Sequence, residues 1–324
     1  MNVNLASTAS TASTQKQTLI GYHANCTDGY TAAWVTCRAL EALDFKVDLI
    51  PLKYSDEESE QLLLDTLCSA SYTELYIVDF SLELDALKFL HSRFPYLAIT
   101  ILDHHKTAFE RYAPELEITP DVHFRRVVEK ATVILDNAES GASLCYKYFN
   151  GYDVNIPHLI AYVKDYDLWQ FTLGESTKWI NKYIRTIEQE LHLWDHLSIS
   201  LNDSHIRSEI LTVGKNLQQV HNDEVRKIVL QARKCTIIGQ KGLCVMCPPE
   251  FSSDVGNVLA LRSGTYGAAY RRREDGSEIW SLRSNGDYDV TVLAKKHGGG
   301  GHKNAAGFSL KKSDIDMVGI EVGA

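Results

Sequence analysis

Two short apolar runs of this sequence end in carboxylate or imidazole side chains. The first carries Asp79, and the second, residues 98–106, ends in Asp103, His104 and His105. A β-branched apolar run bounded by polar residues is typical of a buried strand in a parallel sheet, and such sheets bind ligands outside the carboxyl ends of their strands. Acidic groups gathered this closely repel one another unless a cation lies between them. We therefore expect a divalent metal centre at these strand ends.

Other metal-type side chains lie at predicted strand or helix ends elsewhere in the chain. Mixed carboxylate and imidazole ligation favours Mn²⁺, Mg²⁺ or Fe²⁺ over a structural zinc site. Two such ions, bridged by a carboxylate and a water, would generate hydroxide and hold a phosphoryl group for attack. Asp79 is the expected bridge, because it follows a middle strand. The further candidate ligands are His23, Asp28 and either Asp165 or Asp167.

The elements that position these residues alternate between strands and helices. This alternation predicts an α/β fold with a parallel sheet and right-handed crossovers. Strands are expected at residues 18–23, 45–50, 76–80, 98–103 and 133–136, and helices at residues 28–43, 56–70, 83–93 and 140–149.

The chain of 324 residues is long enough for two domains. Residues 1–17 are rich in Ser, Thr and Ala and predict a disordered leader. The first α/β domain is expected over residues 18–203 and a helical connector over 204–234. Residues 235–316 predict a smaller α+β domain.

The net charge of −9 disfavours binding to long nucleic-acid duplexes. Residues 262–312 nevertheless carry ten Lys or Arg against five Asp or Glu, which suits a short anionic substrate. Seven scattered cysteines indicate reduced thiols. With no signal-peptide pattern and no membrane-spanning run, we expect a cytoplasmic protein with no membrane partner. The helical segments between residues 170 and 230 offer a surface for a homodimer.

A glycine-rich run near the C-terminus has the chemistry of a phosphate-binding turn. Gly299, Gly300 and Gly301 allow backbone amides to approach a phosphate closely, and His302 and Lys303 place polar and charged groups beside it. A second candidate for phosphate recognition, Arg283, is expected at a strand end facing the same cleft.

Two features leave alternatives open. Ser140–Ser143 starts a predicted helix whose amides either contact a phosphate or are simply capped. Trp169, Trp179 and Trp194 either stack on nucleobases or pack in a core, as tryptophans at such spacings usually do.

Two motifs together resemble a known family. Residues 102–105, ending in Asp-His-His, and the glycine-rich segment 298–308 resemble the DHH phosphoesterase superfamily with its C-terminal DHHA1 domain. The likeness covers residues 18–311. Residues 23–29 and 165–169 are similar to the branch that contains nanoRNase B-type oligoribonucleases and related cyclic-nucleotide phosphodiesterases.

The resemblance implies a role for each of these side chains. Asp103 would orient the neighbouring imidazoles, and His105 would contact the scissile phosphate or help to protonate the leaving oxygen. Arg283 and His302 would bind the substrate. One Mn²⁺ ion would be held by His23 and Asp79, and the other by Asp28, Asp79, His104 and Asp165, with Asp167 as the alternative to Asp165.

The first motif departs from the family at one position. Many members have two aspartates one residue apart, of which Asp28 matches the second, and Cys26 stands where the first is expected. Either Cys26 or Asn25 ligates the first ion, or that ion is weakly held.

The resemblance implies a metal-dependent phosphodiesterase that hydrolyses short RNA or DNA oligonucleotides to mononucleotides, with two Mn²⁺ ions, or Mg²⁺ or another divalent ion. Two alternatives use the same metal chemistry: a linear or cyclic dinucleotide phosphodiesterase, and an adenosine 3′,5′-bisphosphate phosphatase. A non-enzymatic alternative, motivated by Cys26, is a nucleotide-binding sensor with a degenerate metal site.

Overall fold

The computed structural model describes residues 16–54, 56–116 and 124–320. The predicted leader, residues 1–17, lies outside these residues except for its last two. Gln17 already belongs to the first strand, which therefore begins one residue before the expected position.

Six strands form the first sheet: β1 (Gln17–His23), β2 (Lys46–Leu52), β3 (Glu74–Val78), β4 (Ala98–Asp103), β5 (Phe124–Val128) and β6 (Ala131–Leu135). Their order is β2-β1-β3-β4-β6-β5, and every pair is parallel except β5 with β6. The predicted parallel α/β fold is confirmed. The sequence does not predict the antiparallel edge strand β5, which is short and contains two arginines.

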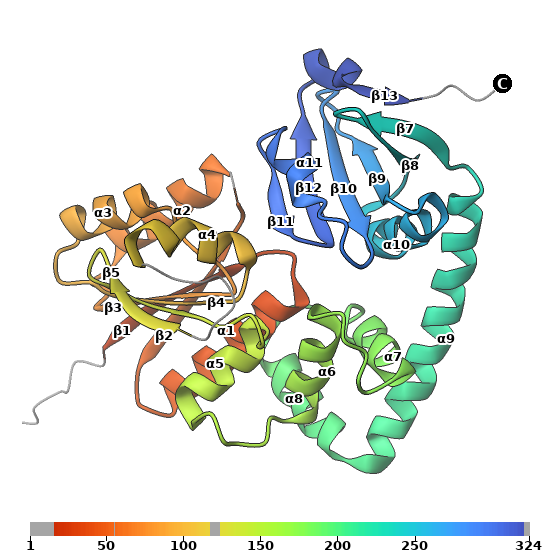
Figure 1. Ribbon diagram of the computed structural model, residues 1–324. Coiled ribbons are helices and arrows are strands. Elements are labelled where there is room, and N and C mark those ends of the chain that lie inside the picture. The colour runs from red at the N-terminus through yellow and green to blue at the C-terminus, as the bar shows by residue number, and fades with distance from the viewer. Residues whose placement is uncertain (1–15, 55, 117–123, 321–324) are drawn as a thin grey trace, which may run out of the picture.

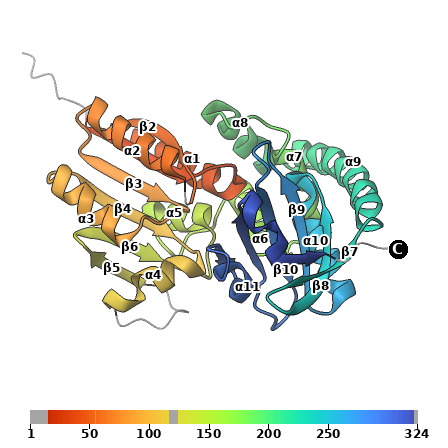
Figure 2. The ribbon, with the colours of Figure 1, turned by 90° about the horizontal axis from the view of Figure 1, so that it is seen from above.

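Helices cover both faces of this sheet (Figures 1 and 2). One face carries α1 (Thr27–Glu41) and α5 (Gly141–Asn150), and the other carries α2 (Glu57–Ser69), α3 (Leu84–Arg93) and α4 (Lys106–Leu116). Alternate residues of a strand point to opposite faces. On β1, Ile20 accordingly packs with α1 and α5, whereas Leu19 packs with α2, α3 and α4.

The strand order places a topological switch between β1 and β3. The chain moves outward from β1 to β2 and then returns to the other side of β1, so crossovers leave these two strands in opposite directions. Open α/β sheets bind ligands outside the carboxyl ends of strands at such a point. His23 ends β1, Asp79 follows β3 and Asp103 ends β4, so all three lie at this edge.

Four helices extend the α1 side of the first unit: α6 (His158–Asp167), α7 (Glu175–Ile184), α8 (Leu191–Asn202) and α9 (Ser204–Val229). Residues of all four share one continuous core with α1 and α5, in which Trp194 is fully buried. The helix α9 occupies most of the predicted connector, residues 204–234. It is packed along α7 over part of its length and then runs to the second unit (Figure 1).

The second unit is built on a seven-stranded sheet: β7 (Arg233–Ile237), β8 (Gln240–Met246), β9 (Tyr266–Arg272), β10 (Glu278–Ser284), β11 (Gly300–His302), β12 (Ala305–Leu310) and β13 (Val318–Ile320). The strand order is β11-β12-β10-β9-β8-β7-β13, and only β8 and β9 pair in parallel. The helices are α10 (Ser252–Ser263), α11 (Thr291–Lys295) and the 3₁₀ turns η1 (Pro249–Phe251) and η2 (Lys312–Met317). Trp280, Tyr266 and Phe308 form the centre of its core.

Across the described parts of the chain, no helix has both the length and the apolar character that crossing a bilayer requires.

The contact between α7 and α9 depends on a glycine. A methyl group on Gly214 would lie 2.1 Å from the backbone oxygen of Trp179, a distance that no real contact reaches. The two helices can therefore approach this closely only because residue 214 has no side chain.

Replacing Gly214 with alanine should destabilise the protein, although the same exchange inside an exposed helix normally stabilises by about 1 kcal/mol. The added methyl group would force α7 and α9 apart, at a cost of about 1–3 kcal/mol. Urea unfolding measures the change. Gln219→Ala, at an exposed position of the same helix, is the matched control and should alter stability by less than about 0.5 kcal/mol. Equal or higher stability of Gly214→Ala would contradict this packing.

Candidate metal centre

Asp79 lies at the middle of the cluster. It is buried, and its backbone has a φ of +53°, an uncommon conformation for a residue with a side chain. Its amide donates to the Leu102 carbonyl (2.8 Å), which fixes this conformation beside β4. Oδ1 lies 3.0 Å from His104 Nε2, and Oδ2 lies 3.4 Å from His23 Nδ1. The carboxylate therefore faces imidazoles from two different strand ends.

Two glycines allow helix starts to approach Asp79. A methyl group on Gly141, at the start of α5, would lie 2.5 Å from Asp79 Cβ. A methyl group on Gly29, in the first turn of α1, would lie 2.3 Å from the His23 carbonyl oxygen. Any side chain at either position would displace the central carboxylate or the strand end next to it.

Asp28 binds the start of α5. Its Oδ1 accepts hydrogen bonds from Ser140 Oγ (2.7 Å) and the Ala142 amide (3.1 Å), and its Oδ2 accepts one from the Gly141 amide (2.5 Å). These amides have no partner within their own helix, and a carboxylate suits the positive end of the helix dipole. The helix start at Ser140–Ser143 therefore binds an internal carboxylate. Asp28 Oδ2 also lies 3.8 Å from His104 Nε2.

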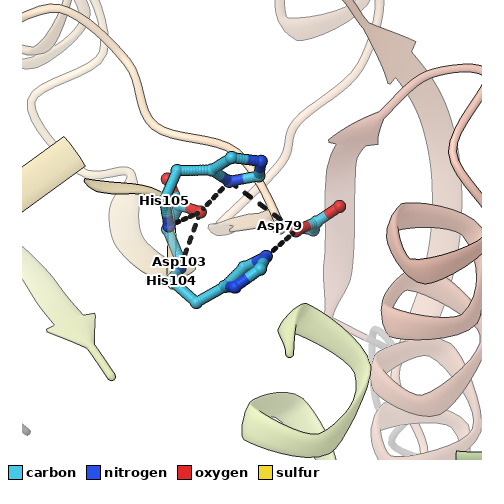
Figure 3. Close-up of side chains that lie close together, drawn as sticks. All are labelled: Asp79, Asp103, His104 and His105. Carbon is cyan, nitrogen blue, oxygen red and sulfur yellow. Dashed lines mark hydrogen bonds and ion pairs between the residues drawn. The ribbon is translucent and has the colours of Figure 1, made fainter. Parts of the chain in front are cut away.

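Asp103 holds the two histidines that follow it. Its Oδ1 accepts from the amides of His104 (2.7 Å) and His105 (3.2 Å) and lies 2.7 Å from His105 Nδ1, while Oδ2 accepts from Ser81 Oγ (2.5 Å). Figure 3 shows nitrogen atoms of both rings directed toward Asp79. These contacts fit the positioning role expected of Asp103 and leave His105 Nε2 free of that carboxylate.

Asp165, the expected metal ligand, lies near the cluster, but both of its carboxylate oxygens are bonded elsewhere. Its Oδ1 accepts from Thr172 N (2.8 Å) and Thr172 Oγ1 (2.6 Å), and its Oδ2 accepts from Leu173 N (3.0 Å) and from Thr177 Oγ1. All of these donors belong to the loop after α6 or to the start of α7.

Asp167, the alternative ligand, takes that place. Its Oδ2 lies 3.5 Å from His104 Nε2, and it groups with Asp28 and His104, with ligand atoms of all three within 4.8 Å of one another. Residues two apart on a helix point in different directions, so only one of the two aspartates of α6 can face the centre.

The charges of the cluster are poorly balanced without a cation. Burial raises the pKa of Asp28 well above its usual range, and repulsion from Asp167 and Asp79 adds to this effect. Burial and the nearby Asp79 likewise raise the pKa of Asp167, although His104 opposes the shift. Burial opposes ionisation of Asp79, but its contacts with His104 and His23 outweigh that effect and lower its pKa. A bound cation would relieve the repulsion between these three carboxylates.

Two buried atoms at this place also lack a hydrogen-bond partner. They are His23 Nδ1 and Asp79 Oδ2, which face each other. Cys26, the N-cap residue of α1, groups with them, with ligand atoms of the three residues within 4.8 Å of one another. Asn25, the other candidate of the sequence, is exposed. Unpartnered donor atoms that converge in this way are the arrangement a metal ion requires, so the residues present fit a divalent ion.

The second unit places His302 against this cluster. The His302 ring stacks on the His105 ring, with centroids 4.9 Å apart, and lies 5.7 Å from the His104 ring. Burial, followed by the positive charge of His105 and His104, lowers the pKa of His302 to about 3. His302 is therefore a neutral ring at physiological pH.

The glycine-rich run forms β11 and the turn before it. A methyl group on Gly299 would lie 2.0 Å from the Gly307 oxygen, and Gly301 has a φ of +135°, so both positions require glycine. A methyl group on Gly300 would lie 3.4 Å from the Thr107 side chain, because β11 lies against the start of α4. Lys303, the charged residue next to this run, pairs its Nζ with Asp287 (3.0 Å) within the second unit.

Arg283 lies on β10 and is half-buried. Its Nη2 donates to Ser253 Oγ (2.7 Å) and its Nη1 to the Leu282 carbonyl (2.9 Å). Burial lowers its pKa, an effect that the hydroxyl group of Tyr166 and the carboxylate of Asp254 oppose. Arg283 also lines a cavity of about 210 Å³ beside α10.

Sequence reasoning missed three residues that shape the centre: Ser81, Gly29 and Gly141. The two glycines each follow a functional residue directly, Asp28 and Ser140, and a small residue beside a candidate ligand is the signal that could have identified them.

Known proteins resemble both the second unit and the whole chain. The family described as DHHA1 domain matches residues 261–318. An uncharacterised protein of Acanthamoeba polyphaga mimivirus, R106, is 26% identical over 304 residues, which are 89% of this chain and 66% of that protein. A bifunctional oligoribonuclease and PAP phosphatase of Thermus thermophilus, NrnA, is 39% identical over 70 residues, 21% of each chain. This chain thus spans less than two thirds of either relative.

Solved structures share the fold. RecJ of Thermus thermophilus in complex with Mn²⁺ is 14% identical with a TM-score of 0.51, covering 93% of this chain and 50% of that one. An exonuclease RecJ bound to manganese is 15% identical with a TM-score of 0.50, covering 93% of this chain and 87% of that one.

Asp167→Asn and Asp165→Asn should have opposite effects. Removing the Asp167 charge should weaken binding of Mn²⁺ at least about tenfold. The stability of the metal-free protein should stay close to that of the parent, because the substitution removes a carboxylate that Asp79 repels. Asp165→Asn should keep most of the metal affinity and lose about 1–3 kcal/mol of stability, because donors of its loop lose an acceptor. Isothermal titration calorimetry and urea unfolding in chelator measure the two quantities. The reverse pattern would return Asp165 to the ligand set.

Proposed function

We propose that this chain, which belongs to the DHH phosphoesterase superfamily and carries a C-terminal DHHA1 domain, is a metal-dependent phosphodiesterase that hydrolyses short oligonucleotides to mononucleotides. In this proposal residues 18–203 form the catalytic domain, 204–234 connect, and 235–316 bind substrate. The observation that carries it is the His302 ring, stacked on His105 at the edge of the carboxylate cluster. A phosphate placed there would touch both units.

The proposed metal sites share Asp79. His23, Cys26 and Asp79 would hold one ion, and the other would be held by Asp28, Asp79, His104 and Asp167. Mn²⁺ is the ion we propose, with Mg²⁺ as the alternative, because carboxylate and imidazole donors dominate. When bound, two such ions supply Lewis acidity that activates a water and stabilises negative charge on the phosphoryl oxygens.

The histidines above the centre would handle the substrate's proton and its position. Asp103 accepts a hydrogen bond from His105 Nδ1, so Nε2 is the atom left to face the substrate, and with both ring nitrogens protonated it would give its proton to the leaving oxygen and remain as the neutral ring. His302, neutral at physiological pH, can donate one hydrogen bond to a phosphate oxygen from across the cleft. Arg283, on β10, would donate hydrogen bonds from its guanidinium group to the terminal phosphate.

The position of the second unit favours a short substrate. Ion pairs join the two units on the α4 side, between Lys106 and Asp289 (3.3 Å) and between Lys295 and Glu110 (2.7 Å). A strand that enters the cleft from one side would meet β11 within a few nucleotides. The Thermus relative is named as an oligoribonuclease, which suits the same length class.

A second candidate is the phosphatase that removes the 3′-phosphate of adenosine 3′,5′-bisphosphate. The name of the same relative includes PAP phosphatase activity, and the same metal centre would serve both reactions. A further alternative is a linear or cyclic dinucleotide phosphodiesterase. It would break the same kind of bond, and only its substrate would differ: a dinucleotide with free or joined ends in place of a short oligonucleotide.

The parent protein should hydrolyse a labelled dinucleotide only with a divalent ion present, and His104→Ala should lower the rate more than about 100-fold, because a proposed ligand of one of the two ions is lost. His196→Ala, an exposed histidine of α8, is the matched control and should retain parental activity.

A panel of RNA and DNA from two to twenty nucleotides, cyclic dinucleotides and adenosine bisphosphate identifies the substrate by product chromatography. Nucleotide binding without turnover under any metal would favour a sensor instead.

Cys26 gives a test of the first metal site that does not depend on turnover. With Co²⁺ bound, the parent should show the near-ultraviolet charge-transfer absorption of a cobalt thiolate, and Cys26→Ser should lack it, because only sulfur produces this band. Cys68→Ser, an exposed cysteine of α2, is the control and should keep the band. A parent without this absorption would exclude Cys26 from the ligands.

A further inference from the structure

We propose that Trp169 is a stacking platform for the nucleobase next to the scissile phosphate, so that the substrate must carry a base. This inference rests on the proposed phosphodiesterase activity and deepens it. It assigns the site to nucleotides and excludes base-free phosphate polymers as preferred substrates. The argument starts from the loop that connects α6 to α7.

The loop is held rigidly by Asp165. The carboxylate accepts from both Thr172 and Leu173, as described above, and the Asp165 carbonyl oxygen accepts from the amides of Gln170 (3.0 Å) and Phe171 (3.5 Å). The buried carboxylate that does not ligate metal thus fixes the conformation of the segment directly after Asp167.

This segment holds two aromatic residues in an unusual backbone conformation. Trp169 has a φ of +56° and Phe171 a φ of +52°, values that bulky residues rarely adopt. Strain of this kind persists only where the surroundings impose it, and it concentrates at ligand-binding sites. Here the imposed conformation leaves 42% of the Trp169 side chain exposed.

Two aromatic rings contact the Trp169 indole, and both do so in T-shaped geometry. Its ring lies 4.7 Å from that of Phe171 at 73° and 5.3 Å from that of Tyr166 at 72°. Aromatic neighbours at such angles fix the orientation of an indole without stacking on it in parallel. The other two tryptophans that the sequence singled out are placed differently. Trp194 is buried in the core, and Trp179 lies beneath Lys215.

The platform is adjacent to the metal centre. Trp169 follows Asp167 by two residues, so the Cα atoms of the two lie within about 7.6 Å. The Asp167 carboxylate is 3.5 Å from His104 Nε2. The segment that carries the indole therefore begins directly at the cluster, and a nucleotide whose phosphate lies at the centre would have the Trp169 loop beside it.

Positive charges surround the aromatic group. The Arg185 guanidinium lies 5.2 Å from the centre of the Tyr166 ring, and Lys178 Nζ lies 5.0 Å from that of Phe171. Aromatic rings interleaved with cations are the recognition pattern of single-stranded nucleic acids, in which bases stack and phosphates bind the cations.

The test compares a dinucleotide with its abasic analogue, in which both bases are missing and the phosphodiester is intact. The parent should prefer the base-bearing substrate in kcat/KM by about 5- to 150-fold, the range that one stacked base contributes. Trp169→Leu should lose this preference, chiefly through KM, and Trp169→Phe should keep most of it. Tyr96→Ala, an exposed aromatic residue at the opposite edge of the sheet, is the control and should behave as the parent.

A binding measurement separates this inference from the proposed function. Adenosine monophosphate should quench tryptophan fluorescence in the parent and not in Trp169→Leu, whereas ribose 5-phosphate should quench neither. Quenching without hydrolysis of any substrate would overturn the proposed function and keep the platform. Hydrolysis with equal rates on base-bearing and abasic substrates, unchanged in Trp169→Leu, would overturn the platform alone. Parental Mn²⁺ affinity and urea stability in Trp169→Leu show that the variant is folded.

Discussion

The contact of Asp79 with imidazoles from two strand ends is the interaction on which the rest of this molecule depends. A buried carboxylate is unfavourable unless it is paired, and here the pairing requires β1, β3 and β4 to end at one level. The left-handed backbone at Asp79 and the glycines at the starts of α1 and α5 all serve this approach. The parallel sheet can be understood as the scaffold that brings these strand ends together.

The strand ends could be predicted from the sequence because they follow from simple periodicity. Apolar runs ending in Asp79 and in Asp103-His104-His105 indicate buried parallel strands, and their shared edge follows from the topology. The choice between Asp165 and Asp167 could not be predicted, because both lie on one short helix and its rotation depends on packing against α1 and α7. Likewise, the sequence shows a helix start at Ser140 but not the Asp28 carboxylate, 112 residues away, that occupies it.

The two aspartates of α6 illustrate how one helix end can serve two purposes. Asp167 faces inward to the carboxylate cluster, and Asp165 faces the loop that presents Trp169. In the function proposed above, the metal centre and the base platform are thereby linked through two residues of a single turn. The Tyr166 ring between them lies beneath the Arg185 guanidinium, which is 5.2 Å from its centre.

The chain passes from the first unit to the second through a short segment, residues 230–232, between α9 and β7. Leu230 in this segment is 80% exposed, while the amides of Gln231 and Ala232 donate to the carbonyls of Ile228 (2.9 Å) and Val229 (3.3 Å) at the end of α9. On the α4 side, the two units are joined by the ion pairs of Lys106 and Lys295, and exposed pairs of this kind contribute about 0–1 kcal/mol each. Dissolved salt weakens them further. Ionic strength therefore sets how much these two pairs contribute to the contact between the units on the α4 side, whereas the stacking of His302 on His105 is independent of salt.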